Sequence, residues 1–170
     1  MISLISKIHC QDFKTYDYFD SVYVNGFHNS KSQLQDLYKI FGSPISKYVP
    51  DYEMCGDGFD TVFYYNGITF YYLNWNKRNI KTSLSDYIWF NNIYLRKGLI
   101  VNVGKIELTD KTKIDKIAKI YPNSFKNRIV KDNEVVMKIS ACIDCQDESY
   151  FELYFIDKKL IRITYYSADC

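Results

Sequence analysis

Thr61–Leu73, with the sequence TVFYYNGITFYYL, is the stretch that decides the fold. Two apolar, aromatic-rich segments flank Asn66 and Gly67, and an Asn-Gly pair in this position is the strongest short-range signal for a β-hairpin. Both residues tolerate the positive φ that a type I′ turn requires. We therefore predict two antiparallel strands joined by a type I′ turn.

A helix is predicted before this hairpin. Ser30 and Gln33 have the spacing of a capping box, which favours a helix that begins after Asn29. The apolar residues that follow recur at i, i+3, i+4 and i+7, the period of one helix face: Leu34, Leu37, Tyr38 and Phe41. Gly42 and Pro44 predict its end.

The second half of the chain contains a similar helix signal in residues 108–124, LTDKTKIDKIAKIYPNS. Thr109 or Asp110 is the predicted cap, and Pro122 is the predicted stop. The apolar residues again mark one helix face: Ile114, Ile117, Ala118 and Tyr121.

A second hairpin follows this helix. The segments 150–155 and 160–166, YFELYF and LIRITYY, flank the turn residues 157–159. A helix followed by a hairpin therefore occurs twice, which predicts a duplicated unit with pseudo-repeats at 22–103 and 104–170.

Further strand signals occur at 86–95 and 99–103, and at 134–143, where apolar residues alternate. Residues 1–30 are predicted to be a short strand or an irregular cover. Strands grouped after each helix favour antiparallel pairing over crossover connections. We predict an α+β fold of two similar helix-then-antiparallel-sheet units, with the helices packed on one face of the sheet.

This tandem pattern resembles the architecture of the beta-lactamase inhibitor protein family and related small bacterial repeat domains, from about Val22 onward. The resemblance rests on Ser30–Pro44 with Thr61–Leu73, and on Thr109–Ser124 with Tyr150–Tyr166. It implies that the chain binds proteins through an aromatic sheet surface. It transfers no individual contact residue to this sequence.

The composition is globular, with an excess of aromatic side chains. Of the 170 residues, 47% are apolar and 25% are charged, both close to ordinary values. A chain of this length buries roughly 70% of the surface of its unfolded form, so we expect residues 1–170 to form a single compact domain. The 17 tyrosines and 11 phenylalanines suit strands and interfaces, although compositional bias and sheet packing also explain them.

The charges do not favour nucleic acid as a partner. The 22 basic and 20 acidic residues are interspersed, so the net charge of +2 creates no strong field for a polyanion. The best candidate stretch, Tyr71–Lys81, mixes aromatic with basic residues but lacks an RNA-binding strand motif.

The apolar run in the N-terminal segment 1–10, MISLISKIHC, is too short for a membrane span. No basic region precedes it, as a signal peptide would require. We therefore expect a cytoplasmic protein with no membrane partner. Five cysteines are scattered through the chain, and we expect them to be reduced thiols: Cys10, Cys55, Cys142, Cys145 and Cys170.

No pattern of catalytic residues is recognised. None of the seven glycines forms a phosphate-binding loop between a strand and a helix. His9 and His28 are the available imidazole bases, and neither lies beside a nucleophile motif. We expect a protein that is not an enzyme and needs no cofactor.

Two segments contain part of a metal-site pattern. Cys142 and Cys145 form a C-x-x-C pair at the end of a predicted strand, but no second ligand pair follows at zinc spacing. The acidic segment 51–60 places Gly56 as in a calcium-binding EF-hand loop, yet Val62 occupies the position of the bidentate glutamate. We expect no bound metal.

The remaining interpretation is a protein-binding module, specifically an immunity-type inhibitor that covers a bacterial toxin or enzyme with a basic active-site surface. Ten residues are candidate partner contacts, seven acidic and three aromatic: Asp51, Glu53, Asp57, Asp60, Asp144, Asp147, Glu148, Tyr71, Trp75 and Trp89. Acidic turns are also commonly just solvated, and the apolar run around Trp89 also fits a core position. A carboxylate-based enzyme and a sheet-face binder of a small ligand or single strand remain alternatives.

Overall fold

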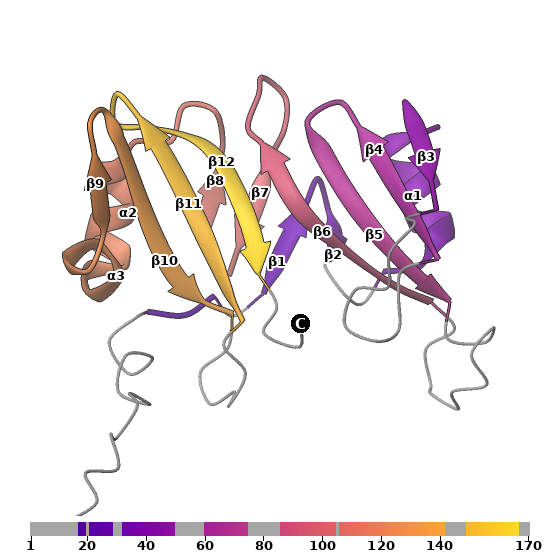
Figure 1. Ribbon diagram of the computed structural model, residues 1–170, viewed down its shortest axis with the longest axis horizontal. Helices are drawn as coiled ribbons and strands as arrows, with labels where there is room; N and C mark the ends of the chain where they lie inside the picture. Colours follow the sequence, from indigo (N-terminus) through magenta and orange to yellow (C-terminus); the bar gives the residue numbers. More distant parts are fainter. Residues whose placement is uncertain are drawn as a thin grey trace, which may run out of the picture.

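The computed structural model has a mixed α+β fold that consists mostly of antiparallel sheet (Figure 1). The residues that the structure describes are 17–19, 21–28, 32–49, 60–74, 86–104, 106–141 and 149–166. Every pairing between the named strands is antiparallel. The predicted α+β class with antiparallel sheet is confirmed at this level.

Two sheets and three helices make up the described part of the chain. The larger sheet has the order β3-β4-β5-β6-β12-β11-β10-β9. Its strands are β3 (Ser46–Tyr48), β4 (Thr61–Tyr65), β5 (Ile68–Asn74), β6 (Asp86–Tyr94), β9 (Ile129–Lys131), β10 (Glu134–Ser140), β11 (Tyr150–Ile156) and β12 (Lys159–Tyr166). The smaller sheet, β2-β1-β7-β8, contains β1 (Val22–Val24), β2 (Phe27–His28), β7 (Val101–Val103) and β8 (Ile106–Leu108). The helices are α1 (Leu34–Phe41), α2 (Ile114–Ile120) and α3 (Pro122–Lys126).

The strand order of each sheet is symmetric about its centre. In the larger sheet β6 meets β12, and in the smaller sheet β1 meets β7. Counted outward from these junctions, the β4–β5 hairpin is matched by β10–β11. The hairpin at 150–166, which we predicted as its counterpart, is β11–β12 and is instead matched by β5–β6. A short turn is a local signal that the sequence shows directly. The position of a hairpin in the sheet depends on pairing between distant strands, which the turn does not indicate.

One face of the larger sheet forms the core. Side chains alternate between the two faces of a strand, and residues in cross-strand register share a face. Phe63 lies opposite Phe70, which in turn lies opposite Phe90. The same buried face continues across the sheet through Ile93, Ile163, Leu153 and Met137. The core therefore extends beneath both halves of the sheet.

Phe70 connects three elements of this core. Its ring centroid lies 5.2 Å from that of Phe27 in β2 and 5.2 Å from that of Phe41 in α1. Within the sheet it packs at 5.8 Å against Tyr65. Aromatic pairs at these separations contribute about 0.5–1.5 kcal/mol each beyond the burial of their area. Phe70 thus holds α1 and the smaller sheet against the larger one.

The predicted first helix is confirmed, but its start is corrected. The N-cap of α1 is Gln33, not Ser30, which lies outside the described residues. The reciprocal contact is made by Asp36, whose carboxylate accepts a hydrogen bond from the Gln33 backbone N–H at 3.0 Å. Gly42 ends the helix with a φ of 74°, and its N–H donates to the Tyr38 carbonyl. A capping pattern is short, so two overlapping pairs can fit the same sequence.

The second predicted helix also begins later than expected. The N-cap of α2 is Lys113, whereas Thr109 belongs to the preceding turn, where its backbone N–H donates to the Thr112 hydroxyl at 2.9 Å. The helix ends at Ile120, as the proline signal predicts. Pro122 then opens α3 instead of only stopping α2, because proline suits the first turn of a helix. In the part of the chain that the structure describes, no helix is long and apolar enough to cross a membrane.

The turn type predicted for the β4–β5 hairpin is wrong, and the structure contains one hairpin that the sequence analysis did not predict. Gly67 has a φ of 83°, but Asn66 does not have a positive φ, so the β4–β5 turn is not type I′. Positive φ at two successive residues occurs instead at Asn25–Gly26, which joins β1 and β2, and at Asp157–Lys158. The N-terminal region thus contains an ordered hairpin, and Lys159 belongs to β12, not to the turn.

We expect Phe70→Ala to lower the free energy of unfolding by about 3–5 kcal/mol, because the truncation opens a cavity among rings from three elements. Urea unfolding followed by circular dichroism measures the change. Tyr48→Ala removes an aromatic ring that is 53% exposed and should cost within about 0.5 kcal/mol. Equal losses in the two variants would contradict the role given to Phe70.

Lys158 adopts a φ of 64°, a conformation that favours glycine. We therefore expect Lys158→Gly to raise the free energy of unfolding by up to about 1 kcal/mol. The neighbouring exposed Lys159 lies in a strand, and Lys159→Gly should lower stability. Thermal unfolding of the pair tests this, and a change of the same sign in both variants would count against the turn assignment.

Candidate functional site

The face of the larger sheet opposite the core carries a band of aromatic side chains. Tyr71 and Trp89 are cross-strand partners on this face, and so are Tyr154 and Arg162. Eight aromatic residues whose side chains the structure describes are placed here by the register and are called the aromatic face: Tyr48, Tyr64, Tyr71, Trp89, Tyr94, Tyr150, Tyr154 and Tyr166. They belong to β3, β4, β5, β6, β11 and β12, so the band crosses the junction of β6 with β12 (Figure 1).

Half of these rings are well exposed. Tyr48 is 53% exposed and Tyr94 is 51% exposed, while Tyr64 and Tyr166 also count among the exposed large side chains. The rest are partly buried against one another. Tyr150 stacks on Tyr166 with ring centroids 5.0 Å apart. An extended band of accessible aromatic rings is uncommon on a monomeric protein and is typical of a contact surface.

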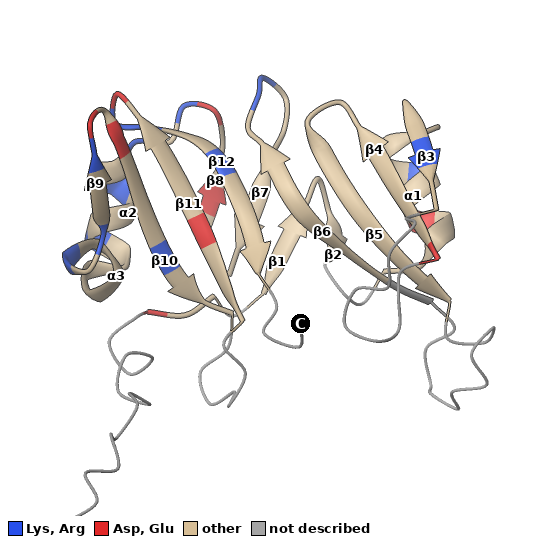
Figure 2. Cartoon of the chain, in the orientation of Figure 1, with Lys and Arg blue, Asp and Glu red and all other residues tan. Residues whose placement is uncertain are grey.

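Charge is distributed unevenly over this sheet. The sequences of β4 and β5 contain no charged residue, and Figure 2 shows both strands without colour. Lys47 of β3 is charged, but its register with Phe63 places it on the core side of the sheet. Most charged side chains of the sheet lie on the strands of the other half. On the aromatic face the register places six charged residues: Lys131, Glu134, Lys138, Glu152, Lys159 and Arg162. The face therefore has an uncharged aromatic half and a half that adds charged groups to aromatic ones.

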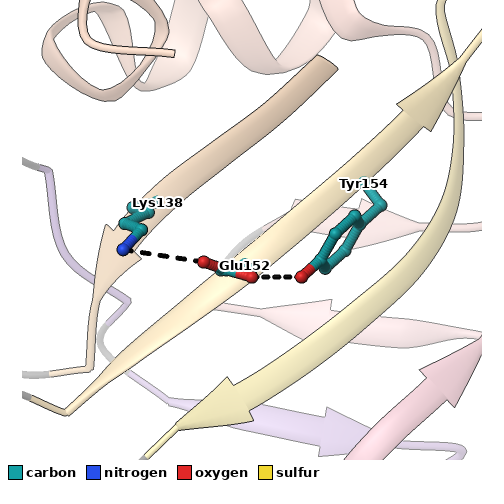
Figure 3. A network of polar contacts seen from close by, with 3 residues as sticks. All are labelled: Lys138, Glu152 and Tyr154. Carbon is teal, nitrogen blue, oxygen red and sulfur yellow. Dashed lines mark hydrogen bonds and ion pairs between the residues drawn. The ribbon is translucent and has the colours of Figure 1, made fainter. Parts of the chain in front are cut away.

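Glu152 is the centre of a polar network in the charged half (Figure 3). Only 9% of this residue is exposed. Its carboxylate lies 3.6 Å from the Lys138 ammonium and accepts a short hydrogen bond from the Tyr154 hydroxyl. Lys138 also lies over the Tyr150 ring, 4.3 Å from its centroid. A buried carboxylate is costly without partners, and these contacts offset that cost.

Tyr154 is held in its neutral form. Burial raises the pKa of its phenol, and the hydrogen bond to Glu152 raises it further because the negative carboxylate opposes a phenolate. The hydroxyl therefore remains a donor to Glu152 over the physiological pH range.

Arg162 lies next to this network at the junction of the two halves. Its guanidinium is 3.7 Å from the Tyr154 ring centroid and 5.7 Å from that of Tyr94. One terminal nitrogen, Nη1, donates to the Tyr94 hydroxyl at 3.4 Å. Nε is buried and makes no hydrogen bond. Among the described residues, no carboxylate forms an ion pair with Arg162.

Three of the ten candidate contacts from the sequence lie in the described part. Tyr71 and Trp89 pack together with ring centroids 6.1 Å apart, and Trp89 is partly exposed on the aromatic face rather than placed in the core. The Asp60 carboxylate accepts a hydrogen bond from the Asn74 backbone N–H, which closes the start of β4 against the end of β5. The other seven lie outside the described residues: Asp51, Glu53, Asp57, Trp75, Asp144, Asp147 and Glu148.

The sequence analysis missed the charged part of this surface. Glu152 and Arg162 occur inside YFELYF and LIRITYY, which we interpreted only as hairpin strands. The sequence did contain a signal for Glu152: Tyr150, Glu152 and Tyr154 occupy every second position of one strand and therefore share a face. That Arg162 meets Tyr94 could not be derived, since 68 residues separate them in the chain.

The described residues contain no group of three or more His, Cys, Asp or Glu side chains that could hold a metal ion. The five cysteines, and with them the Cys142–Cys145 pair, lie outside those residues, as does His9. His28 is on β2 in the smaller sheet, where its ring packs edge-on at 4.5 Å against Tyr23. It is on a different sheet from Glu152 and Arg162.

We expect the free energy of unfolding to fall as the pH rises above about 10, the usual tyrosine pKa. The folded state keeps the pKa of Tyr154 above that value, so its stabilising effect is complete below pH 10 and is lost as the pH approaches the folded pKa. Tyr154→Phe should therefore show a shallower alkaline loss in urea unfolding. Wild type and variant should have parallel profiles near neutral pH, and parallel profiles at alkaline pH as well would contradict the assignment.

Comparison of the chain with family models, with curated proteins and with solved structures found no match in any of the three.

Proposed function

We propose that this chain is a non-enzymatic protein-binding module, an immunity-type inhibitor that binds and blocks a bacterial toxin or enzyme through the aromatic face of its larger sheet. The observation that carries the proposal is the band of accessible rings across β3, β4, β5, β6, β11 and β12. Tyrosine and tryptophan are enriched at the centres of protein interfaces. They bring a large contact area at a small cost in side-chain entropy.

The rigidity of the sheet supports this use. The rings extend from paired strands, with their backbones held by the cross-strand register. Several are also fixed by neighbours, as Tyr71 is by Trp89 and Tyr150 by Tyr166. A surface that is already ordered loses little conformational freedom when a partner binds, which leaves more of the contact energy as affinity.

The proposed architecture is two similar helix-then-antiparallel-sheet units within one compact domain, with the helices on one face of the sheet. Two short strands, a helical segment and four strands of the larger sheet follow one another twice along the chain, with α1 as the helical segment the first time and α2 with α3 the second time. Ring contacts of Phe41 with Tyr65, and of Tyr38 with Phe63, join α1 to the core face. This leaves the aromatic face for a partner, as in the beta-lactamase inhibitor architecture that the sequence pattern resembles.

The acidic segments form the second part of the proposal. Residues 51–60 and 144–148 supply the seven acidic candidates, and they immediately precede β4 and β11. Both strands contribute rings to the aromatic face. Acidic side chains beside such a face would accelerate encounter with a partner that has a basic active-site surface. The proposed location of this inhibitor is the cytoplasm.

The test is a pull-down from native cell lysate with the neighbouring gene product co-expressed, followed by mass spectrometry and a binding assay on the purified partner. Trp89→Ala should weaken the complex at least about tenfold, since truncation of an interface anchor commonly costs 2 kcal/mol or more. Tyr38→Ala is the matched control, because Tyr38 is an exposed aromatic residue of α1 on the core side.

Equal affinity for the Trp89 and Tyr38 variants would exclude the aromatic face as the binding surface. A clean negative at low salt, with no stoichiometric partner, would favour the alternatives: a carboxylate-based enzyme or a sheet-face binder of a small ligand.

A further inference from the structure

We infer that Arg162 is the point on the aromatic face that receives a carboxylate from the protein partner, either an aspartate or a glutamate side chain. This inference rests on the proposed function, because it names the chemistry of one contact on the same surface. The group is a guanidinium held between the rings of Tyr94 and Tyr154, at the junction of β6 with β12.

Of two cationic groups on the aromatic face, Lys138 has a carboxylate partner among the described residues and Arg162 has none. Glu152 is the nearest acidic residue in the strand register, yet its oxygens are taken by Lys138 and by the Tyr154 hydroxyl. Arg162 instead contacts two phenols, which are neutral. Within the described part of the chain, Lys138 is therefore balanced by Glu152, whereas Arg162 has no balancing carboxylate.

The guanidinium is also positioned before any ligand arrives. Stacking on Tyr154 at 3.7 Å and the hydrogen bond from Nη1 to Tyr94 restrict its plane. Nε is buried and makes no hydrogen bond, so neither water nor another side chain satisfies this part of the guanidinium. A planar guanidinium of fixed orientation matches a carboxylate through paired hydrogen bonds.

A lone guanidinium between two neutral rings favours a monoanion over a phosphate. A phosphate group carries close to two negative charges and is usually bound by several cations or by a helix N-terminus. Here one arginine is available and Glu152 lies beside it, which repels a second negative charge. The flanking rings suit the methylene groups of an acidic side chain.

The first experiment uses sodium acetate as the probe and the Arg162 Nε–H signal in a ¹⁵N-edited spectrum as the reporter. A buried Nε–H exchanges slowly with water, so its signal should be observable, and its absence from Arg162→Gln assigns it. We expect a saturable shift with acetate and none with acetamide. Arg128 is the internal control, since it also lies over a ring, that of Phe125, but donates Nη1 to a backbone carbonyl.

Three results of the titration would overturn the inference. These are no saturable shift with acetate, an equal shift of Arg128 and Arg162, or saturation by inorganic phosphate at a lower concentration than by acetate. The last result would reassign the site to phosphate groups.

The second experiment separates this inference from the proposed function. With the captured partner, Arg162→Gln should reduce affinity about 10- to 100-fold, the usual loss for a charged hydrogen bond, and Arg128→Gln should leave it unchanged. Arg162→Lys, which keeps the charge, should retain part of the affinity even if the glutamine variant is poorly folded. A complex that is lost in Trp89→Ala but intact in both Arg162 variants would remove the carboxylate contact and leave the proposed function standing. If acetate binds at Arg162 but no protein partner is found, the carboxylate site would stand and the proposed function would lose its support.

Discussion

The pairing of β6 with β12 is the constraint on which the rest of the structure depends. It places Ile93 opposite Ile163 in the core, and on the other face it brings Tyr94 to Arg162. A hydrogen bond of 2.8 Å from the Thr164 hydroxyl to the Asn92 side chain closes the same junction. Without this pairing the chain would contain two four-stranded sheets, each with an additional unpaired edge, and such edges promote aggregation. With it, the aromatic side chains form one continuous face.

The two halves of this continuous face offer different kinds of contact to a partner. The half formed by β3 to β6 offers rings and amides, and a partner there would be bound by apolar contact and shape. The half formed by β9 to β12 adds the network of Lys138, Glu152 and Tyr154, in which each charged or polar group has a partner. Arg162 lies where the halves meet and is the exception. Among the described residues Arg162 has no carboxylate partner, and such a group provides specificity because a partner protein without the matching group leaves it unpaired.

Local patterns predicted the elements more accurately than their limits. The Asn-Gly signal located the β4–β5 hairpin, and apolar periodicity located α1 and α2. The turn type at Asn66 and the caps of both helices were wrong by a few residues, since these depend on φ angles and hydrogen bonds that several overlapping patterns satisfy equally. For the candidate site, Tyr71 and Trp89 were predicted as contacts from their residue type, and both lie on the aromatic face. Arg162 and Glu152 were missed, because a charged residue inside an apolar strand is informative only when its face is known.

The sequence by itself determined the α+β class, the antiparallel hairpins and the alternation that gives the longer strands a core side and an opposite side. These follow from interactions between residues that are close in the chain, where side-chain period and turn chemistry act directly. The tertiary structure alone decided that β6 pairs with β12 and that β1 pairs with β7. Pairings between distant strands depend on which buried faces fit together in three dimensions, and local propensity does not encode that fit. For the same reason, the sequence contained Arg162, Tyr94 and Tyr154, but only the folded sheet placed them in one site.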